Sequence, residues 1–135
     1  MDFKDKVVLV TGGSRGLGRA MAGGFARAGA KIIVASRKLE ACESAVSEIR
    51  EAGGEATAVA AHMGDTESLD KLVDASYASY GRVDILINNA GINVGMGPLS
   101  DLTPQLYDKM YEVNQRGPWY LASRLAPRMG QHGGG

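Results

Sequence analysis

The sequence predicts an α/β fold built on a doubly wound parallel sheet, with helices covering both faces. Four short apolar runs alternate with longer amphipathic segments along the 135 residues, a pattern typical of parallel strands joined by right-handed helical crossovers. The apolar runs are continuous rather than alternating, as expected of strands buried on both faces. We therefore expect one domain spanning residues 1–135, a length that usually forms a single hydrophobic core.

The predicted strands are the runs richest in aliphatic and β-branched residues. They cover residues 7–10, 32–35, 57–61 and 83–87. The first run ends at Thr11-Gly12 and the fourth runs into residues 88–91, Asn-Asn-Ala-Gly. Such polar and glycine residues mark the points where a strand gives way to a loop.

The amphipathic segments between these runs predict the helices. The first covers residues 17–28 and ends at Gly29, because glycine most easily adopts the left-handed conformation after a helix. The second ends at Gly53-Gly54, and the third follows a cap at Asp65 or Thr66. The residues expected to be buried on the second and third helices are Cys42, Ala45, Val46, Ile49, Leu69, Leu72, Val73, Ser76, Tyr77 and Tyr80.

The last helix begins at Thr103-Pro104. A capping residue followed by proline is favourable there, because the first turn of a helix does not use the missing N–H. We expect an interruption at Gly117-Pro118 and a continuation toward Met129. The predicted architecture therefore contains four strands and four helices.

Composition and charge exclude several classes of function. Fifteen Lys and Arg residues balance fifteen Asp and Glu residues, so the chain lacks the basic excess of a nucleic-acid-binding domain. Cys42 is the single cysteine, which excludes an internal disulfide. No apolar run approaches the roughly 18–20 residues that span a bilayer, and the N-terminal residues do not form a signal peptide. We expect a cytoplasmic protein without nucleic-acid or membrane partners.

Glycine is over-represented, and a glycine-rich loop lies between the first strand and the first helix at residues 11–18. Unpaired N–H groups at a helix N-terminus attract phosphate. Glycine would allow the tight turn at Gly12, close approach of a pyrophosphate at Gly16 and close helix packing at Gly18. The alternative is an ordinary surface loop, but the position favours nucleotide binding. The predicted ligands here are Gly12, Ser14, Arg15, Gly16, Leu17 and Gly18.

Three motifs together resemble the N-terminal portion of the short-chain dehydrogenase/reductase family. They are Thr-Gly-x-x-x-Gly-x-Gly at 11–18, Asn-Asn-Ala-Gly at 88–91, and Val-Asn-x-x-Gly at 113–117. The resemblance covers the whole chain and implies a Rossmann-type fold. It is similar to 3-oxoacyl-carrier reductases and to sugar-acid dehydrogenases, and the sequence does not separate the two.

The end of the second strand favours NADP(H) over NAD(H). An acidic residue about 20 residues beyond the glycines normally selects NAD, whereas this chain has Ser36 and Arg37. These residues, together with Arg15, are suited to a 2′-phosphate through charge-assisted hydrogen bonds. The alternative is that the cations are simply solvated, which is the preferred interpretation for Lys38 taken alone.

The resemblance assigns further contacts with the cofactor. It implies that Asn89 ties neighbouring strands together, while Ala90 and Gly91 run beside the nicotinamide ribose. His62 stands where the family usually has an acid, so it either contacts adenine or is an exposed loop residue. Met63 follows it and offers its backbone N–H.

Asn114 is the one predicted catalytic residue within the chain. An amide in the middle of a helix is neither a good helix former nor a usual core residue, and the resemblance implies that it holds a water of the proton relay. The family's Tyr-x-x-x-Lys pair and serine are not found. Tyr120 and Arg124 repeat that spacing on a different helix, and arginine holds its proton too firmly for a relay.

We expect an NADP(H)-dependent oxidoreductase that interconverts a carbonyl and a secondary alcohol by hydride transfer. Residues 133–135 resemble the loop before the family's serine-bearing strand, so we expect a domain truncated before its fifth strand and inactive alone. The alternative is a non-catalytic dinucleotide-binding module. The implied partners are a small carbonyl or alcohol substrate and, in the full-length form, further copies in a dimer or tetramer. Met96, Pro98 and Leu99 either line the substrate site or cover the sheet, and no metal site is expected.

Overall fold

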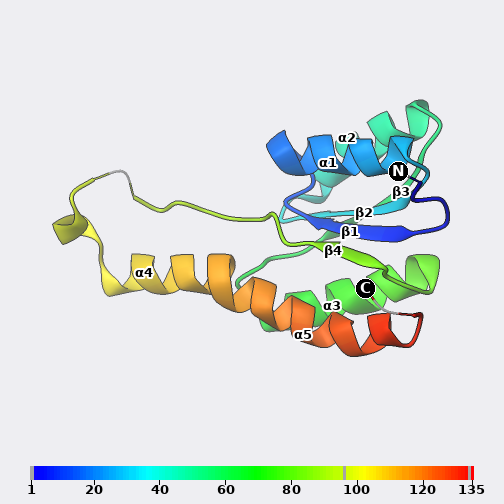
Figure 1. Cartoon of the computed structure of the whole chain (residues 1–135). Coiled ribbons are helices and arrows are strands. Elements are labelled where there is room, and N and C mark those ends of the chain that lie inside the picture. The colour runs from blue at the N-terminus through cyan, green and yellow to red at the C-terminus, as the bar shows by residue number, and fades with distance from the viewer. Residues whose placement is uncertain (1, 96, 134) are drawn as a thin grey trace.

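A computed structural model describes residues 2–95, 97–133 and 135, so Met96 and Gly134 lie outside the described residues. Its centre is a four-stranded parallel sheet in the order β3-β2-β1-β4 (Figure 1). The strands are β1 (Val7–Thr11), β2 (Lys31–Ser36), β3 (Glu55–Ala60) and β4 (Ile85–Ile87). The predicted α/β fold with a doubly wound parallel sheet is confirmed.

Helices cover both faces of the sheet (Figure 1). On one face lie α1 (Gly16–Arg27) and α2 (Leu39–Glu51); on the other lie α3 (Thr66–Tyr80) and α5 (Gly117–Gly130). Because successive strand residues point to opposite faces, Val8 and Val10 join the core beneath α1 and α2, whereas Val7 and Leu9 join the core beneath α3 and α5. This double burial explains why the sequence of β1 is apolar without alternation.

Two strands begin two residues away from the predicted start, and the other strand boundaries differ from the prediction by at most one residue. β3 begins at Glu55 rather than at residue 57, because Lys31 pairs with Glu55 in the register of β2 and β3. β4 begins at Ile85 rather than at residue 83, because Asp84 interrupts the regular ladder. The N–H of Val7 donates to Oδ2 of Asp84 at 2.9 Å, so a carboxylate replaces the backbone carbonyl there.

The last predicted helix is a composite, and its interruption lies earlier than predicted. It consists of α4 (Pro104–Tyr111), a π-helical turn η2 (Glu112–Arg116) and α5. The prediction placed the break at Gly117-Pro118, where α5 instead begins. Pro118 explains the distortion, since it lacks the N–H that the carbonyl of Asn114 would accept in a regular α-helix. A π-turn inside a helix is often found at functional sites.

The segment between β4 and α4 includes a short 3₁₀ turn, η1 (Leu99–Asp101). In Figure 1, η1 and α4 lie beyond the edge of the sheet at which β4 ends. Leu99 is 86% exposed, so it does not cover the sheet. No helix in the described part of the chain is long and apolar enough to cross a membrane.

Candidate nucleotide-binding site

The topology of the sheet creates a crevice at the carboxyl ends of its strands. The chain leaves β1 toward β2 on one side, whereas β4 pairs with β1 on the other. Loops therefore diverge beyond Thr11 and Ile87, and in open α/β sheets such a switch point is where ligands bind. A cavity of about 550 Å³ lies at this position.

Four chain segments that follow β1, β2, β3 and β4, together with the helix at α4 and η2, line the cavity. All twelve residues predicted to contact the cofactor line it: Gly12, Ser14, Arg15, Gly16, Leu17, Gly18, Ser36, Arg37, Met63, Asn89, Ala90 and Gly91. The other lining residues are Thr11, Ala35, Lys38, Ala41, Ala61, His62, Ile92, Lys109 and Val113. The structure thus brings the predicted ligands together, and their contact with a cofactor stays a prediction.

The glycine loop holds the start of α1 against the ends of β1 and β4. Gly12 has a φ of 63°, in the left-handed region. A Cβ on Gly18 would lie 2.3 Å from the carbonyl oxygen of Gly12 and 2.5 Å from Nδ2 of Asn89, so only glycine allows this packing. Gly16, Leu17 and Gly18 form the first turn of α1, whose N–H groups are suited to an anion.

Thr11 and Asn89 join β1 to β4 through a compact hydrogen-bond network. The Thr11 hydroxyl donates to the carbonyl of Ile87 at 3.2 Å and accepts from the N–H groups of Asn89 and Ala90, each at 3.1 Å. The side-chain amide of Asn89 donates to the carbonyls of Thr11 at 3.0 Å and Gly12 at 3.3 Å. Asn89 therefore ties the two strands together at the floor of the cavity.

The cavity has an unbalanced charge. Its lining includes Arg15, Arg37, Lys38 and Lys109 and no Asp or Glu, although the whole chain is neutral. Within residues 2–95, 97–133 and 135, none of these four cations forms an ion pair. A concave site with cations of one sign concentrates anionic ligands.

Ser36 is the last residue of β2, and its hydroxyl contacts Cys42 and the backbone of Lys38. Its Oγ lies 3.0 Å from Sγ of the buried Cys42 and 3.4 Å from the carbonyl oxygen of Lys38, to which it donates. Arg37 follows it and is exposed. The end of β2 thus presents a hydroxyl and two cations to the cavity.

The loop after β3 forms the opposite wall. Nδ1 of His62 accepts the N–H of Gly64 at 3.0 Å, and the His62 N–H donates to the Ser68 hydroxyl at 2.9 Å. His62 is exposed and also lines the cavity, and its contact with adenine stays a prediction. Met63 is 7% exposed.

Asn114 lies in η2 and is bound to the segment after β4. Its Oδ1 accepts the Ile92 N–H at 2.8 Å, and its Nδ2 donates to the Ile92 carbonyl at 2.7 Å. Asn114 does not itself line the cavity, but Ile92 and Val113 do. The helix is thus distorted at Asn114 itself, and the role of this residue in proton transfer stays a prediction.

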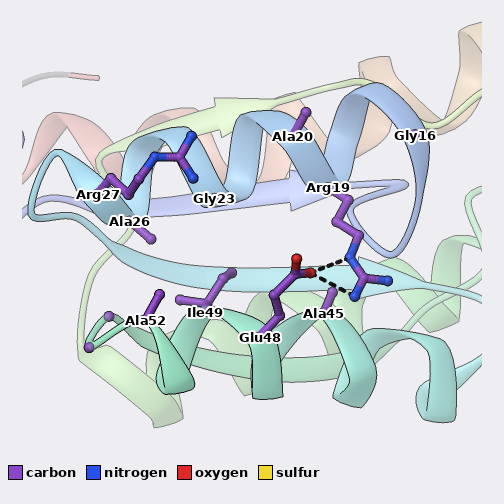
Figure 2. Close-up of a pocket in the computed structure, with 12 residues that line it drawn as sticks. Gly16, Arg19, Ala20, Gly23, Ala26, Arg27, Ala45, Glu48, Ile49 and Ala52 are labelled. Carbon is purple, nitrogen blue, oxygen red and sulfur yellow. Dashed lines mark hydrogen bonds and ion pairs between the residues drawn. The ribbon is translucent and has the colours of Figure 1, made fainter.

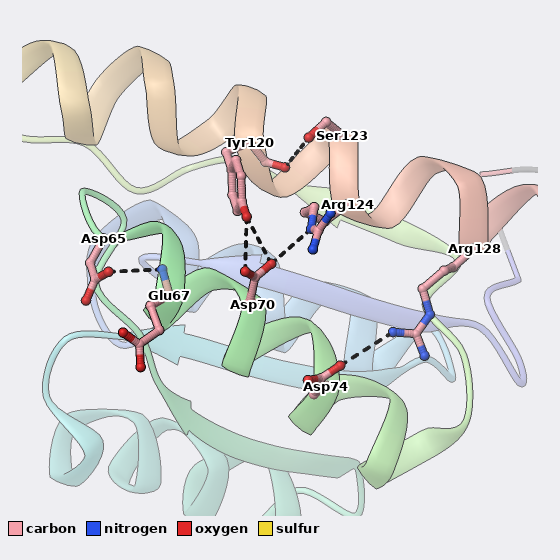
Figure 3. Close-up of polar contacts among 8 residues, drawn as sticks. All are labelled: Asp65, Glu67, Asp70, Asp74, Tyr120, Ser123, Arg124 and Arg128. Atoms are coloured by element: carbon pink, nitrogen blue, oxygen red, sulfur yellow. Dashed lines mark hydrogen bonds and ion pairs between the residues drawn. The ribbon is translucent and has the colours of Figure 1, made fainter.

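Tyr120 and Arg124 do not line the cavity and point toward α3 (Figure 3). The Tyr120 hydroxyl donates to Asp70 at 3.0 Å, and Nε of Arg124 donates to the same carboxylate at 2.9 Å. The hydrogen bond to Asp70 raises the pKa of Tyr120, whereas a proton donor near neutral pH needs a lowered one. This pair is therefore an interhelical contact.

A second, larger hollow of about 730 Å³ separates α1 from α2 (Figure 2). Small side chains line most of it, and an ion pair between Arg19 and Glu48, 2.7 Å long, crosses it. Arg19 and Glu48 neutralise each other, which leaves Arg27 as the lining charge without an ion pair among the described residues. The chemistry therefore favours the smaller cavity as the functional site.

Lys109 and Thr11 are two of the lining residues that were not predicted as ligands. Lys109 precedes Val113 by four positions, so both lie on one helix face, and this spacing from the residue before Asn114 was the available signal. From the sequence, Thr11 was identified only as the first residue of the glycine motif. Its bonds to the segment after β4 depend on strands 76 residues apart in the sequence becoming neighbours.

Curated proteins with similar sequences are reductases. The chain is 42% identical over 118 residues to a probable tetrahydroxynaphthalene reductase of Zymoseptoria tritici, covering 87% of this chain and 44% of the relative. It is 40% identical over 130 residues to versicolorin reductase of Emericella nidulans, covering 96% and 48%. Dehydrogenase/reductase SDR family member 4 of Homo sapiens is 34% identical over 131 residues, covering 97% and 47%. The chain thus spans about half the length of these relatives.

Solved structures agree with this grouping. A metagenomic short-chain oxidoreductase in complex with NADP superimposes with a TM-score of 0.93 at 33% identity, covering 98% of this chain and 60% of that protein. The 3-ketoacyl-(acyl-carrier-protein) reductase of Brucella melitensis complexed with NADH gives 0.91 at 35% identity, covering 98% and 53%. The sequence profile described as short chain dehydrogenase matches residues 6–135. This chain, with its glycine loop, its Asn-Asn-Ala-Gly segment and its parallel sheet, belongs to the short-chain dehydrogenase family.

Proposed function

We propose that this chain is the cofactor-binding part of an NADP(H)-dependent oxidoreductase that interconverts a carbonyl and a secondary alcohol. The observation that carries the proposal is the charge of the cavity, which has four cations and no carboxylate. NADP(H) has three phosphate groups, so such a cavity suits it better than a neutral ligand.

The residues present fit NADP(H) at two separate points. The first turn of α1 would hold the pyrophosphate. Gly18 lies in this turn, at a position with no space for a side chain. Arg15 and Arg37, with the Ser36 hydroxyl, would hold the 2′-phosphate. Among the similar solved structures, one is in complex with NADP and another with NADH. The family therefore leaves the choice open, and the cations after β2 support NADP(H).

Asn114 would serve proton transfer through its backbone rather than its side chain. Both polar atoms of its side chain already bond to Ile92. Its carbonyl lacks the usual α-helical donor, because that position is Pro118. We propose that this carbonyl holds a water of the relay, while the bound cofactor supplies or accepts the hydride.

The direct test is titration of the intact gene product with NADPH and with NADH, followed by fluorescence or calorimetry. We expect saturable binding of both, with NADPH at least about tenfold tighter because of the 2′-phosphate contacts. Absence of a saturable complex with either nucleotide would overturn the proposal.

The second candidate is a non-catalytic module that binds the dinucleotide in the same cavity. Turnover separates the two candidates. An intact gene product that binds NADPH but oxidises it with none of a panel of aldehydes, ketones and 3-oxoacyl thioesters would favour the module.

The remaining parts of the proposal concern the cell and the assembly. We propose a small carbonyl or alcohol substrate, a cytoplasmic location and a full-length form that assembles as a homodimer or homotetramer. Light scattering of the purified gene product and fractionation of cells that produce it would test the last two.

A further inference from the structure

The π-helical turn η2 contacts two separate walls of the cavity. On one side, Asn114 is doubly hydrogen-bonded to Ile92, which follows β4. On the other side, Arg116 reaches the loop after β3, where Nη2 donates to the carbonyl of Gly64 at 3.0 Å. Ile92 and the residues just before Gly64 both line the cavity, so η2 is a brace between its walls.

The helix also packs closely against the loop after β3 at Met63 and Gly64. A Cβ on Gly117 would lie 2.1 Å from the carbonyl oxygen of Met63, so the two backbones touch. A Cβ on Gly64 would lie 3.4 Å from Cγ2 of Val113, which is buried. Displacement of this loop would therefore move the side of the cavity that Ala61, His62 and Met63 form.

Arg116 supplies the polar part of this contact. Its guanidinium bonds to Gly64 and also forms an ion pair with Glu112, one turn earlier, at 3.3 Å. A hydrogen bond from a charged donor to a carbonyl is among the stronger ones in proteins. The ion pair with Glu112 fixes the side chain of Arg116 in the direction of the loop.

We propose that Arg116 is a positioning residue for the adenosine half of the cofactor, acting through the His62–Gly64 loop without touching the nucleotide. This inference rests on the proposed function, because it requires NADP(H) in the cavity. Arg116 does not line the cavity, so its effect on binding has to pass through the wall. β3 and β4 lie at opposite edges of the sheet. The loop after β3 would therefore contact the adenosine end of the cofactor, so we expect displacement of the loop to affect that end first.

The test is calorimetric titration of the protein and its Arg116→Met variant with adenosine 2′-monophosphate and with NADPH. Arg116→Met should weaken adenosine 2′-monophosphate about fivefold, the order expected for partial loss of one charged hydrogen bond. Arg116→Lys, which keeps the charge and a donor, should lie between the variant and the parent protein.

Arg124→Met is the matched control. Arg124 lies on the same composite helix and ties it to α3, and neither Arg124 nor its partner Asp70 lines the cavity. Arg124→Met should lower the melting temperature and leave the affinity for adenosine 2′-monophosphate unchanged. Equal affinities of Arg116→Met and the parent protein, or equal weakening by Arg116→Met and Arg124→Met, would overturn the inference.

The outcomes separate this inference from the proposed function. If the parent protein binds neither NADPH nor adenosine 2′-monophosphate, the proposed function itself fails. If Arg116→Met does not fold, the affinities of Arg116→Lys and Arg124→Met for adenosine 2′-monophosphate are compared instead. Arg116→Lys should weaken this binding measurably, whereas Arg124→Met should not. Parent-like binding by Arg116→Lys would then contradict the positioning role.

Discussion

Cations that are distant in the sequence become neighbours because the strands that precede them are paired in parallel. Thr11 of β1 pairs with Ala35 of β2, so the residues that follow the two strands emerge side by side. Arg15 and Arg37 therefore line one cavity although 22 positions separate them. Neither cation has a carboxylate partner among the described residues, which leaves their charge available to a ligand.

Arg37→Asp should reverse the preference for the nucleotide. A carboxylate at the end of β2 would repel a 2′-phosphate and accept hydrogen bonds from ribose hydroxyls. We expect the Kd for NADPH to rise at least about tenfold and that for NADH to stay constant or fall. Binding titrations with both nucleotides measure this change.

Lys4→Asp is the control for Arg37→Asp, because it changes the net charge equally at an exposed residue outside the cavity. It should leave the ratio of the two dissociation constants unaltered. A similar change of the ratio in both variants would mean that overall charge, rather than a local contact, selects the nucleotide.

At the scale of elements, α5 is bound to α3 by polar contacts along one side (Figure 3). Asp70 accepts hydrogen bonds from Tyr120 and from Arg124, while Arg128 lies 3.8 Å from Asp74. Arg128 also lies over the ring of Tyr77, 3.5 Å from its centroid. These contacts orient the composite helix that holds Asn114 beside the cavity.

Asp70→Asn should destabilise the junction of α3 and α5, because the amide loses the ion pair with Arg124 and weakens the bond from Tyr120. We expect the free energy of unfolding to fall by about 1 kcal/mol, as for a well-formed, partly exposed network. Asp74→Asn should have nearly no effect, since Asp74 is 82% exposed and its ion pair is long. Urea unfolding of the three proteins measures the difference, and equal loss in both variants would contradict it.

At the scale of the whole molecule, the two ends of the sheet have different tasks. The carboxyl ends of the strands form the cavity, whereas the amino ends are joined by a buried carboxylate, Asp84. Asp84 accepts hydrogen bonds from Arg82 and from the Val7 N–H, and Lys6 lies 3.8 Å away. Burial acts to raise the pKa of Asp84, but the bonds from Arg82 and Val7 and the charges of Arg82 and Lys6 outweigh it, so the pKa is lowered.

Asp84→Asn should lower the free energy of unfolding by about 2 kcal/mol at neutral pH, because the ion pair between the buried carboxylate and the partly exposed Arg82 is lost and the bond from the Val7 N–H is weakened. A folded-state pKa below the ordinary 3.8 means that Asp84 stabilises the protein above that pH and loses this effect as the pH falls through the folded pKa. The difference between the two proteins should therefore shrink between neutral pH and a pH below 3.8.

Urea unfolding at both pH values tests this expectation, with Asp108→Asn as a control at an exposed residue. A difference between the parent protein and Asp84→Asn that stays constant across this range would contradict the assigned charge of Asp84.

The sequence predicted the elements well and their junctions less well. Val7, Val8, Leu9 and Val10 are fully apolar, and only a strand buried on both faces explains that pattern. The start of β4 was missed because the Asp84 carboxylate takes the place of a backbone carbonyl, which is a tertiary contact with Val7. The predicted break in the last helix lay a few residues too late. Pro118 lacks the N–H that would bond to the carbonyl of Asn114, so the distortion begins one turn earlier.

The sequence by itself determined the α/β class and the residues of the glycine loop, because apolar continuity and glycine spacing are local properties of the chain. Only the tertiary structure decided that Lys109 lines the cavity with the other cations. It also decided that Tyr120 donates a hydrogen bond to Asp70 and that Arg116 donates one to the loop after β3. Each of these contacts joins elements far apart in the sequence, and their distance is set by the packing of helices on the sheet rather than by any local preference.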